Sequence, residues 1–218
     1  MSNKFIVTNE WLEEMEVYDY GDELQAFNVY FPNGGEALEV LKLCEKSGYI
    51  VFGRWLVNKL PSNYYPPLIL NNFMGNLLYP NDVYVKGDMC VQKFIYIKGS
   101  LKAEGKITIN KHGEIYSDKE YVSADEIDID ADGCICGNVK ANRINLDDNA
   151  RIIGKDIVTK IFNSKGGQVW DNIEAEEVIN NGGIIYGNVN AVKIENINGG
   201  KIKGKTIYKN INEQIEQN

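Results

Sequence analysis

The stretch ICGNVKA, residues 135–141, decides the fold, because versions of it recur along the second half of the chain. Each copy has Gly or Asp, a polar residue, an aliphatic residue, any residue and then Ala, and the clearest copies are GSLKA at 99, GNVKA at 137, DNIEA at 171 and GNVNA at 187. Degenerate copies begin at Gly154 and Gly204. Such a repeat is typical of a solenoid, in which each coil buries its apolar face against its neighbours.

The spacing of this repeat predicts the length of the coil. The anchors Gly137, Gly154, Asp171, Gly187 and Gly204 are 17, 17, 16 and 17 residues apart, and Ser117 and Gly99 extend the series upstream with steps of 20 and 18. Two residues before each anchor stands an aliphatic residue that must point inward: Ile97, Ile115, Ile135, Ile152, Val169, Ile185 and Ile202. We therefore expect residues 83–211 to form a parallel β-helix of roughly seven coils of about 17 to 20 residues.

Three further columns follow from the same anchors. Small residues stand four positions before the last five anchors, where the chain turns a tight corner: Gly133, Ala150, Gly167, Gly183 and Gly200. Seven positions after these anchors a second aliphatic wall is expected: Ile144, Ile161, Val178, Ile194 and Ile211. Asn163, Asn180 and Asn196 lie nine positions after three successive anchors and predict an asparagine ladder along the stack.

Residues 1–60 predict a small α-helical domain in front of the β-helix. Asn9 is expected to cap a helix from Glu10 to about Tyr18, and the glutamates in its first turn suit the positive end of the helix dipole. A second helix is expected from Glu36 to Ser47, and residues 49–60 favour a helix over a strand.

Three prolines predict the boundary between the two parts. Pro61, Pro66 and Pro67 cannot lie inside a helix or a central strand, so residues 61–82 are expected to form a linker or a first coil. The last residues, 212–218, are expected to form a polar tail.

The overall charge restricts the classes of function. The 218 residues carry a formal charge of -8 with a pI near 4.8, which disfavours a general nucleic-acid binder or a protein that grips anionic lipid. The chain begins without an apolar signal segment and has no run of 18 apolar residues, so we expect a soluble, cytoplasmic protein that does not insert into a membrane.

One face of the predicted β-helix carries an apolar stripe. If the aliphatic column points inward, the residues directly before each anchor point outward, with lysines at the two ends: Lys98, Tyr116, Cys136, Ile153, Trp170, Tyr186 and Lys203. Contiguous apolar surface of this kind often marks a partner site, and Trp and Tyr are its usual anchors. We expect partner binding through Tyr116, Ile153, Trp170 and Tyr186. The alternative is that another part of the chain covers the stripe.

A second exposed feature is a group of carboxylates. In EIDIDAD, from 126 to 132, alternation sends Ile127 and Ile129 inward and the acids outward. The predicted acidic face comprises Asp125, Asp128, Asp130, Asp147 and Asp148. It is either a solvated surface that discourages aggregation or a docking site for a basic partner. The spacing of known calcium loops is absent.

The chain offers little catalytic chemistry. His112, the single histidine, is expected in a turn without a nucleophile beside it, and the four cysteines show no CxxC spacing. We therefore predict free thiols, no metal, no cofactor and no catalytic residue. Cys134 and Cys136 lie on one face of a strand, where packing or surface exposure is the more common role of such a pair.

The repeats IKGSLKA, ICGNVKA and IYGNVNA resemble those of the bactofilins, polymer-forming bacterial cytoskeletal proteins, over residues 83–208. The resemblance implies a right-handed parallel β-helix that assembles end to end into homo-oligomers without nucleotide. Bactofilins typically carry short tails around the helix, whereas this chain has a helical domain that would block one end.

The sequence thus predicts a non-enzymatic structural or protein-interaction module. An inhibitor or immunity-type protein that binds one enzyme through an acidic or aromatic face is the alternative. A carbohydrate-active β-helix enzyme is a second alternative, although such enzymes need larger coils and long catalytic loops.

Overall fold

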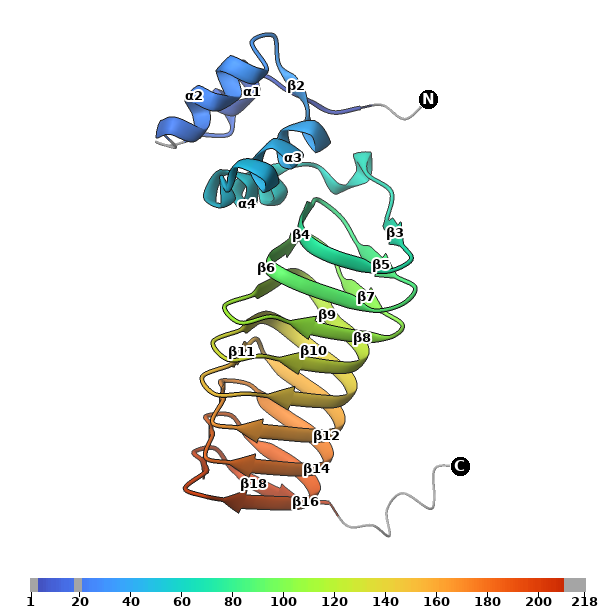
Figure 1. The fold of residues 1–218 in the computed structure, drawn as a ribbon, viewed down its shortest axis with the longest axis vertical. Coiled ribbons are helices and arrows are strands. Elements are labelled where there is room, and N and C mark those ends of the chain that lie inside the picture. Colours follow the sequence, from blue (N-terminus) through green and yellow to red (C-terminus); the bar gives the residue numbers. More distant parts are fainter. Residues whose placement is uncertain (1–3, 18–20, 210–218) are drawn as a thin grey trace.

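The computed structural model shows a parallel β-solenoid of about eight coils with four helices stacked on its N-terminal end (Figure 1). It describes residues 4–17 and 21–209, without the side chains of 118–120. The predicted class, a mainly β chain with a parallel β-helix and N-terminal helices, is confirmed. The right-handed sense of the coil stays a prediction.

Each coil contributes three strand segments, which stack into three faces. Face A contains the second halves of β4 (Phe73–Tyr79) and β6 (Met89–Ile97), then β11 (Arg151–Ile153), β13 (Gln168–Val169), β15 (Ile184–Ile185) and β17 (Lys201–Ile202). Face B begins with β3 (Leu68–Leu70), β5 (Val83–Val85) and β7 (Leu101–Ala103) and ends with β18 (Thr206–Tyr208). Face C contains β8 (Lys106–Ile109) and the second halves of β12 (Asp156–Lys165), β14 (Asn172–Asn181) and β16 (Val189–Ile197). β9 (Glu114–Ile129) and β10 (Cys134–Leu146) bend across all three faces.

The inward column of face A forms a continuous part of the hydrophobic core. Parallel pairing aligns one aliphatic residue from every coil: Leu77, Ile95, Ile115, Ile135, Ile152, Val169, Ile185 and Ile202. The prediction that Ile97 belongs to this column is wrong, because Ile97 pairs with Ser117 and Ile95 pairs with Ile115. The corner that follows face A is longer in the first coils than in the later ones, so columns on different faces do not share one spacing.

The second aliphatic wall, on face C, also differs from its prediction by one residue. Ile144 pairs with Phe162 and not with Ile161, which is only half-buried, and Phe162 pairs in turn with Val178. The cause is an extra residue near Lys155: coils are 17 apart at Ile135–Ile152 but 18 apart at Ile144–Phe162. Ile194 completes the wall, and the predicted Ile211 lies outside the described residues.

The corner between faces C and A explains the column of small residues. A residue with positive φ, between 58° and 88°, turns the chain at His112, Asp132, Asn149, Gly166 and Gly182. The residue that follows is packed against the turn, so that a Cβ added at Gly183 would lie 2.4 Å from the Ser164 hydroxyl oxygen. His, Asp, Asn and Gly tolerate the left-handed region best, which places His112 in a structural role.

The four helices form the N-terminal unit. α1 (Asn9–Glu14) is shorter than predicted, and Thr8, rather than the predicted Asn9, caps it by accepting a hydrogen bond from the Trp11 N–H at 3.2 Å. α2 (Gly21–Tyr30) was not predicted from the sequence; it buries Phe27 against Phe52. A short antiparallel pair, β1 (Ile6–Val7) and β2 (Gly35–Glu36), joins the unit together.

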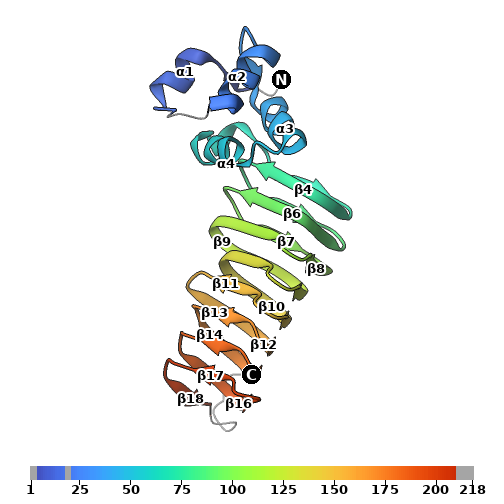
Figure 2. The same cartoon turned by 60° about the vertical axis from the view of Figure 1, so that its left-hand side comes forward.

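The other two helices match their predictions and cover the first coil. α3 (Ala37–Ser47) ends at Gly48 with φ of 76°, and α4 (Ile50–Lys59) confirms the preference for helix. After a short 3₁₀ turn (Ser62–Tyr64), the segment 61–82 supplies β3 and β4. α3 and α4 lie directly over β4, whereas the C-terminal coil lies at the opposite end (Figure 2).

Specific contacts fix the helices to the first coil. Glu45 Oε1 of α3 accepts a hydrogen bond of 2.7 Å from the N–H of Leu78 in β4, and the Lys98 ammonium donates to the carbonyl of Leu60 at 2.7 Å. Gly53 of α4 lies so close to Leu78 that an added Cβ would be 2.4 Å from Leu78 Cδ1. The helices therefore cover the β4 part of the N-terminal edge of the β-stack, where an unpaired strand would otherwise meet solvent.

Candidate interaction surfaces

The outward column of face A gathers the residues of the predicted stripe. Tyr116 pairs with Cys136 and Cys136 with Ile153, while Trp170 and Tyr186 continue the column on the next two coils. The column also includes Tyr96, which pairs with Tyr116 and takes the place expected for Lys98. Lys98 lies beyond the column and binds the Leu60 carbonyl.

The N-terminal helices cover one half of this column, Tyr96 and Tyr116, hereafter the covered half. Tyr96 is only 5% exposed, and its hydroxyl donates a hydrogen bond of 2.5 Å to Glu114. Burial and this hydrogen bond raise the pKa of Tyr96. The guanidinium carbon of Arg54 in α4 lies 5.2 Å from the ring centre of Tyr96 and 4.5 Å from that of Tyr116. Tyr116 thus contacts the helical unit of its own chain.

The rest of the column, Ile153, Trp170 and Tyr186, is the open half. Ile153 is 40% exposed and Trp170 is 42% exposed, and Tyr186 is half-buried. The rings of Trp170 and Tyr186 stack with centres 5.1 Å apart and planes 10° from parallel. The Lys203 ammonium lies 4.5 Å from the centre of the Tyr186 ring. Trp170 and Lys203 approach Tyr186 from the coils on either side, so both faces of the Tyr186 ring are used within the protein.

The surroundings of the open half are basic. Neighbouring outward positions hold Arg151, Gln168, Ile184, Lys201 and Lys203. In the four coils that contribute residues 151–153, 168–170, 184–186 and 201–203 to face A, all of which the structure describes, no outward position of that face holds a carboxylate. A chain with a net charge of -8 thus presents one apolar patch with a positive rim.

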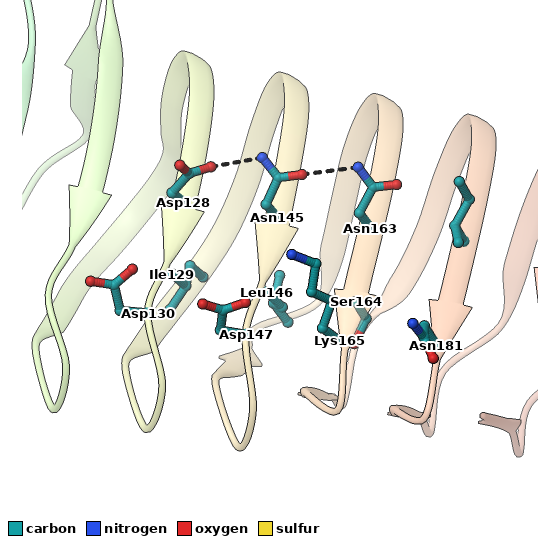
Figure 3. A pocket seen from close by; sticks show the side chains of 11 residues that line it. Asp128, Ile129, Asp130, Asn145, Leu146, Asp147, Asn163, Ser164, Lys165 and Asn181 are labelled. Atoms are coloured by element: carbon teal, nitrogen blue, oxygen red, sulfur yellow. Dashed lines mark hydrogen bonds between the residues drawn. The ribbon is translucent and has the colours of Figure 1, made fainter. Parts of the chain in front are cut away.

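The predicted acidic residues do not form one face: three line one groove, one borders another, and one lies in a turn. Asp128, Asp130 and Asp147 line a groove of about 480 Å³ on face C, between β9, β10, β12 and β14 (Figure 3). Asp125 lies at the next corner, accepts a hydrogen bond from Asn142 and borders the larger groove of face B. Asp148 lies in a turn, against Gly166.

The groove on face C is partly neutralised. Asp128 contacts the Lys106 ammonium and accepts a hydrogen bond of 2.7 Å from Asn145 Nδ2. Burial alone would raise the pKa of Asp128, but these two partners outweigh it and lower the pKa. Asp130, which is half-buried, and Asp147, which is exposed, line the same groove near the ends of their strands (Figure 3).

A polar ladder runs along this groove, in a different register from the predicted one. Asn163 Nδ2 donates to Asn145 Oδ1 at 2.9 Å, so the ladder is Asp128, Asn145 and Asn163 (Figure 3). The predicted step from Asn163 to Asn180 is wrong, because Asn163 pairs with Ile179. The predicted step from Asn180 to Asn196 is confirmed, because Asn180 Nδ2 donates to Asn196 Oδ1 at 2.8 Å. The extra residue near Lys155 explains why Asn163 is out of register with these two.

A groove larger than the one on face C lies on face B and was missed by sequence analysis. It has a volume of about 830 Å³, and its lining includes Tyr121, Lys102, Lys140 and Lys160 beside Asp125 and Glu104. The lysines belong to different coils. The lengths of the corners, which the sequence did not reveal, decide which of these lysines lie close together. The mixture of charges gives this groove no clear ligand preference.

The described residues offer few groups for catalysis or metal binding. In residues 4–17 and 21–209, apart from the side chains of 118–120, no three His, Cys, Asp or Glu side chains meet to hold a metal ion. The His112 imidazole is exposed, with Nδ1 3.7 Å from an oxygen of Asp132. All four cysteines carry free thiols.

No family model, no curated protein and no solved structure matches the chain. The similarity to bactofilins therefore rests on the repeat pattern, and the architecture establishes a β-solenoid scaffold. No helix in the described part of the chain combines the length and apolar character needed to cross a membrane.

Proposed function

We propose that the protein is a non-enzymatic interaction module whose open half of face A binds an acidic protein surface with apolar anchors. The observation that carries this proposal is the exposed Trp170, stacked on Tyr186, with Arg151, Lys201 and Lys203 at outward positions of the same face. Trp and Tyr dominate binding energy at protein interfaces, and complementary charge selects the partner and speeds encounter.

The rigidity of the sheet supports this assignment. Ile152, Val169 and Ile185 are buried directly beneath the open half, and each strand is hydrogen-bonded to both neighbours. Side chains held in this way lose little conformational entropy when a partner binds. Because the ring faces of Tyr186 are already occupied, the patch is poorly suited to stacking on a sugar, which disfavours the carbohydrate-active alternative.

The test is capture of interacting proteins by the full-length chain and by Trp170→Ser/Tyr186→Ser. The double variant should lose the partner while its thermal unfolding shows that the fold is retained. Tyr30→Ser, which removes a 65% exposed tyrosine from α2, is the matched control and should capture normally. Equal capture by the double variant and the wild type would refute the proposal.

A second candidate function is binding of a basic enzyme through the groove on face C, as expected for an inhibitor or immunity-type protein. Asp130 and Asp147, which line the groove, favour it. Such binding should weaken steeply with salt and should be lost in Asp130→Asn/Asp147→Asn. The open-half double variant should leave it unchanged.

We also propose that the full-length chain forms a discrete particle rather than the filaments that the bactofilin resemblance implies. The β4 part of the N-terminal edge is covered by α3 and α4 through Glu45 and Gly53. At the other end, the last strands β16, β17 and β18 carry or adjoin Lys201, Lys203, Lys205 and Lys209, and lysines on edge strands oppose pairing with another chain. Light scattering should give a monomer or a small closed homo-oligomer. Filaments in negative-stain images would contradict this.

A further inference from the structure

Cys134 and Cys136 form a thiol pair on the outer side of face A. They are alternate residues of β10, so both side chains point outward while Ile135 between them is fully buried. Their sulfur atoms lie 3.7 Å apart. β10 pairs with β9 on one side and with β11 and β12 on the other, which fixes the backbone beneath the pair.

This geometry opposes a disulfide between the two residues. Alternate residues on an extended strand have Cα atoms about 6.6–6.8 Å apart, from a rise of 3.3–3.4 Å per residue. That separation is at the upper limit of the range that disulfides tolerate, and most disulfides are shorter by about 1 Å. Because the ladder holds the strand extended on both sides, the pair remains a dithiol.

The sulfur separation suits a metal ion. A tetrahedral ion with metal–sulfur bonds near 2.3 Å holds two thiolates roughly 3.8 Å apart. A two-coordinate ion needs a wider separation, which rotation of the partly exposed Cys136 side chain can provide. Zinc requires four ligands, and no third His, Cys, Asp or Glu joins the pair within the described part of the chain. Soft monovalent ions such as Cu(I) prefer thiolates and need fewer ligands.

Charged groups of both signs lie around the pair. Glu114 and Arg151 flank Cys134 in the strand ladder, and Arg54 of α4 lies over the Tyr96 and Tyr116 rings on the neighbouring coils. The other two thiols lie elsewhere: Cys44 is buried in α3, where burial raises its pKa to about 12, and Cys90 lies within 3.5 Å of Asn110 Oδ1.

We propose that Cys134 and Cys136 form a two-thiolate binding site for a soft monovalent metal ion, with Cu(I) as the fitting occupant. Binding breaks the two S–H bonds, forms two sulfur–copper bonds and releases the thiol protons to solvent, with no change of oxidation state. The site lies between the covered half and the open half, so an occupied site adjoins Tyr116 on one side and Ile153 on the other.

The test is anaerobic titration of the reduced full-length chain with Cu(I) against a chromogenic Cu(I) chelator. The wild type should bind one equivalent of Cu(I). Cys134→Ser and Cys136→Ser should each bind Cu(I) at least about 100-fold more weakly, because loss of one thiolate removes the chelate effect. Cys90→Ser, the matched control, should bind like the wild type.

X-ray absorption of the loaded protein should show two sulfur neighbours per copper, and light scattering should show no copper-dependent dimer. Wild-type uptake no tighter than that of both serine variants, or loss of uptake in Cys90→Ser, would overturn the proposal. Should Cys134→Ser unfold, the Cys136→Ser variant decides, because the Cys136 side chain is partly exposed and its replacement leaves the core intact.

Discussion

The covered half and the open half belong to the same outward column of face A, but they have different surroundings. Tyr96 and Tyr116 occupy the same column as Ile153, Trp170 and Tyr186, on the same kind of strand. Arg54 lies over the rings of the first two, and Tyr96 is buried, whereas Ile153 and Trp170 are exposed beside basic residues. The repeat therefore generates the surface, and the non-repeating helical unit decides which part of it is available to a partner.

The largest expected effect is a loss of stability when one aromatic residue of each half is truncated to alanine. Tyr96→Ala should lower the free energy of unfolding by about 3–5 kcal/mol, because it leaves a buried cavity and removes the partner of Glu114. Trp170→Ala should cost only about 1 kcal/mol, mainly lost stacking on Tyr186. Urea unfolding measures both, and equal costs would show that the two halves do not differ in burial.

Gly53→Ala should loosen the helices from the first coil. The added methyl group would meet Leu78 Cδ1 at 2.4 Å and Cys44 Cβ at 3.0 Å, which costs about 1–3 kcal/mol. The better helix propensity of alanine offsets up to about 1 kcal/mol of this. Asn58→Ala, at an exposed position of the same helix, should not destabilise the protein. Hydrogen exchange in β4 should rise in the first variant alone; unchanged exchange would mean that the helices tolerate the methyl group.

Arg54→Ala tests the contact that covers the first half. Loss of the interaction with the Tyr96 and Tyr116 rings should cost about 0.5–1 kcal/mol. Because Arg54 helps to lower the pKa of Cys136, the pH profile of thiol alkylation should shift to higher pH in this variant. Lys42→Ala, an exposed charge on α3, provides the control. An unshifted profile would show that Arg54 does not act on the thiol.

The smallest effect is a pH dependence at the helix–solenoid contact. Burial raises the pKa of Glu45, and the hydrogen bond from Leu78 only partly offsets this. Since the folded pKa lies above the unfolded value of 4.5, the proton is held more tightly in the folded chain. The resulting stabilisation is present below about pH 4.5 and is lost as the pH rises through the folded pKa.

Glu45→Gln should therefore flatten the fall in stability above pH 4.5, whereas Glu39→Gln, an exposed position on the same helix, should follow the wild type. Urea midpoints at several pH values measure this difference. A wild-type slope in Glu45→Gln would mean that another group titrates.

The sequence predicted the solenoid because inward positions such as Ile135, Ile152 and Val169 repeat without interruption. It could not give the register of every face, since one extra residue near Lys155 shifts Phe162 into the place expected for Ile161. The corners vary in length without disturbing the core, so only the ladder of hydrogen bonds reveals where residues are added.

The candidate surface was predicted in part for a similar reason. Alternation along the strands was enough to send Trp170 and Tyr186 outward. Arg54 carries no signal of its own in the sequence, because its contact with Tyr96 depends on how the helices dock on the solenoid. Helix α2 was missed because its apolar residues do not form one buried face: Phe27 is buried, whereas Val29 and Tyr30 are exposed.

The most direct test of the account compares protein capture by three forms of the full-length chain: the wild type, Trp170→Ser/Tyr186→Ser and Asp130→Asn/Asp147→Asn. The account predicts that one acidic partner is retained by the wild type and by the acidic-groove variant, and is lost from the open-half variant. A partner that is lost from the acidic-groove variant and retained by the open-half variant would contradict it, and would transfer the function to face C.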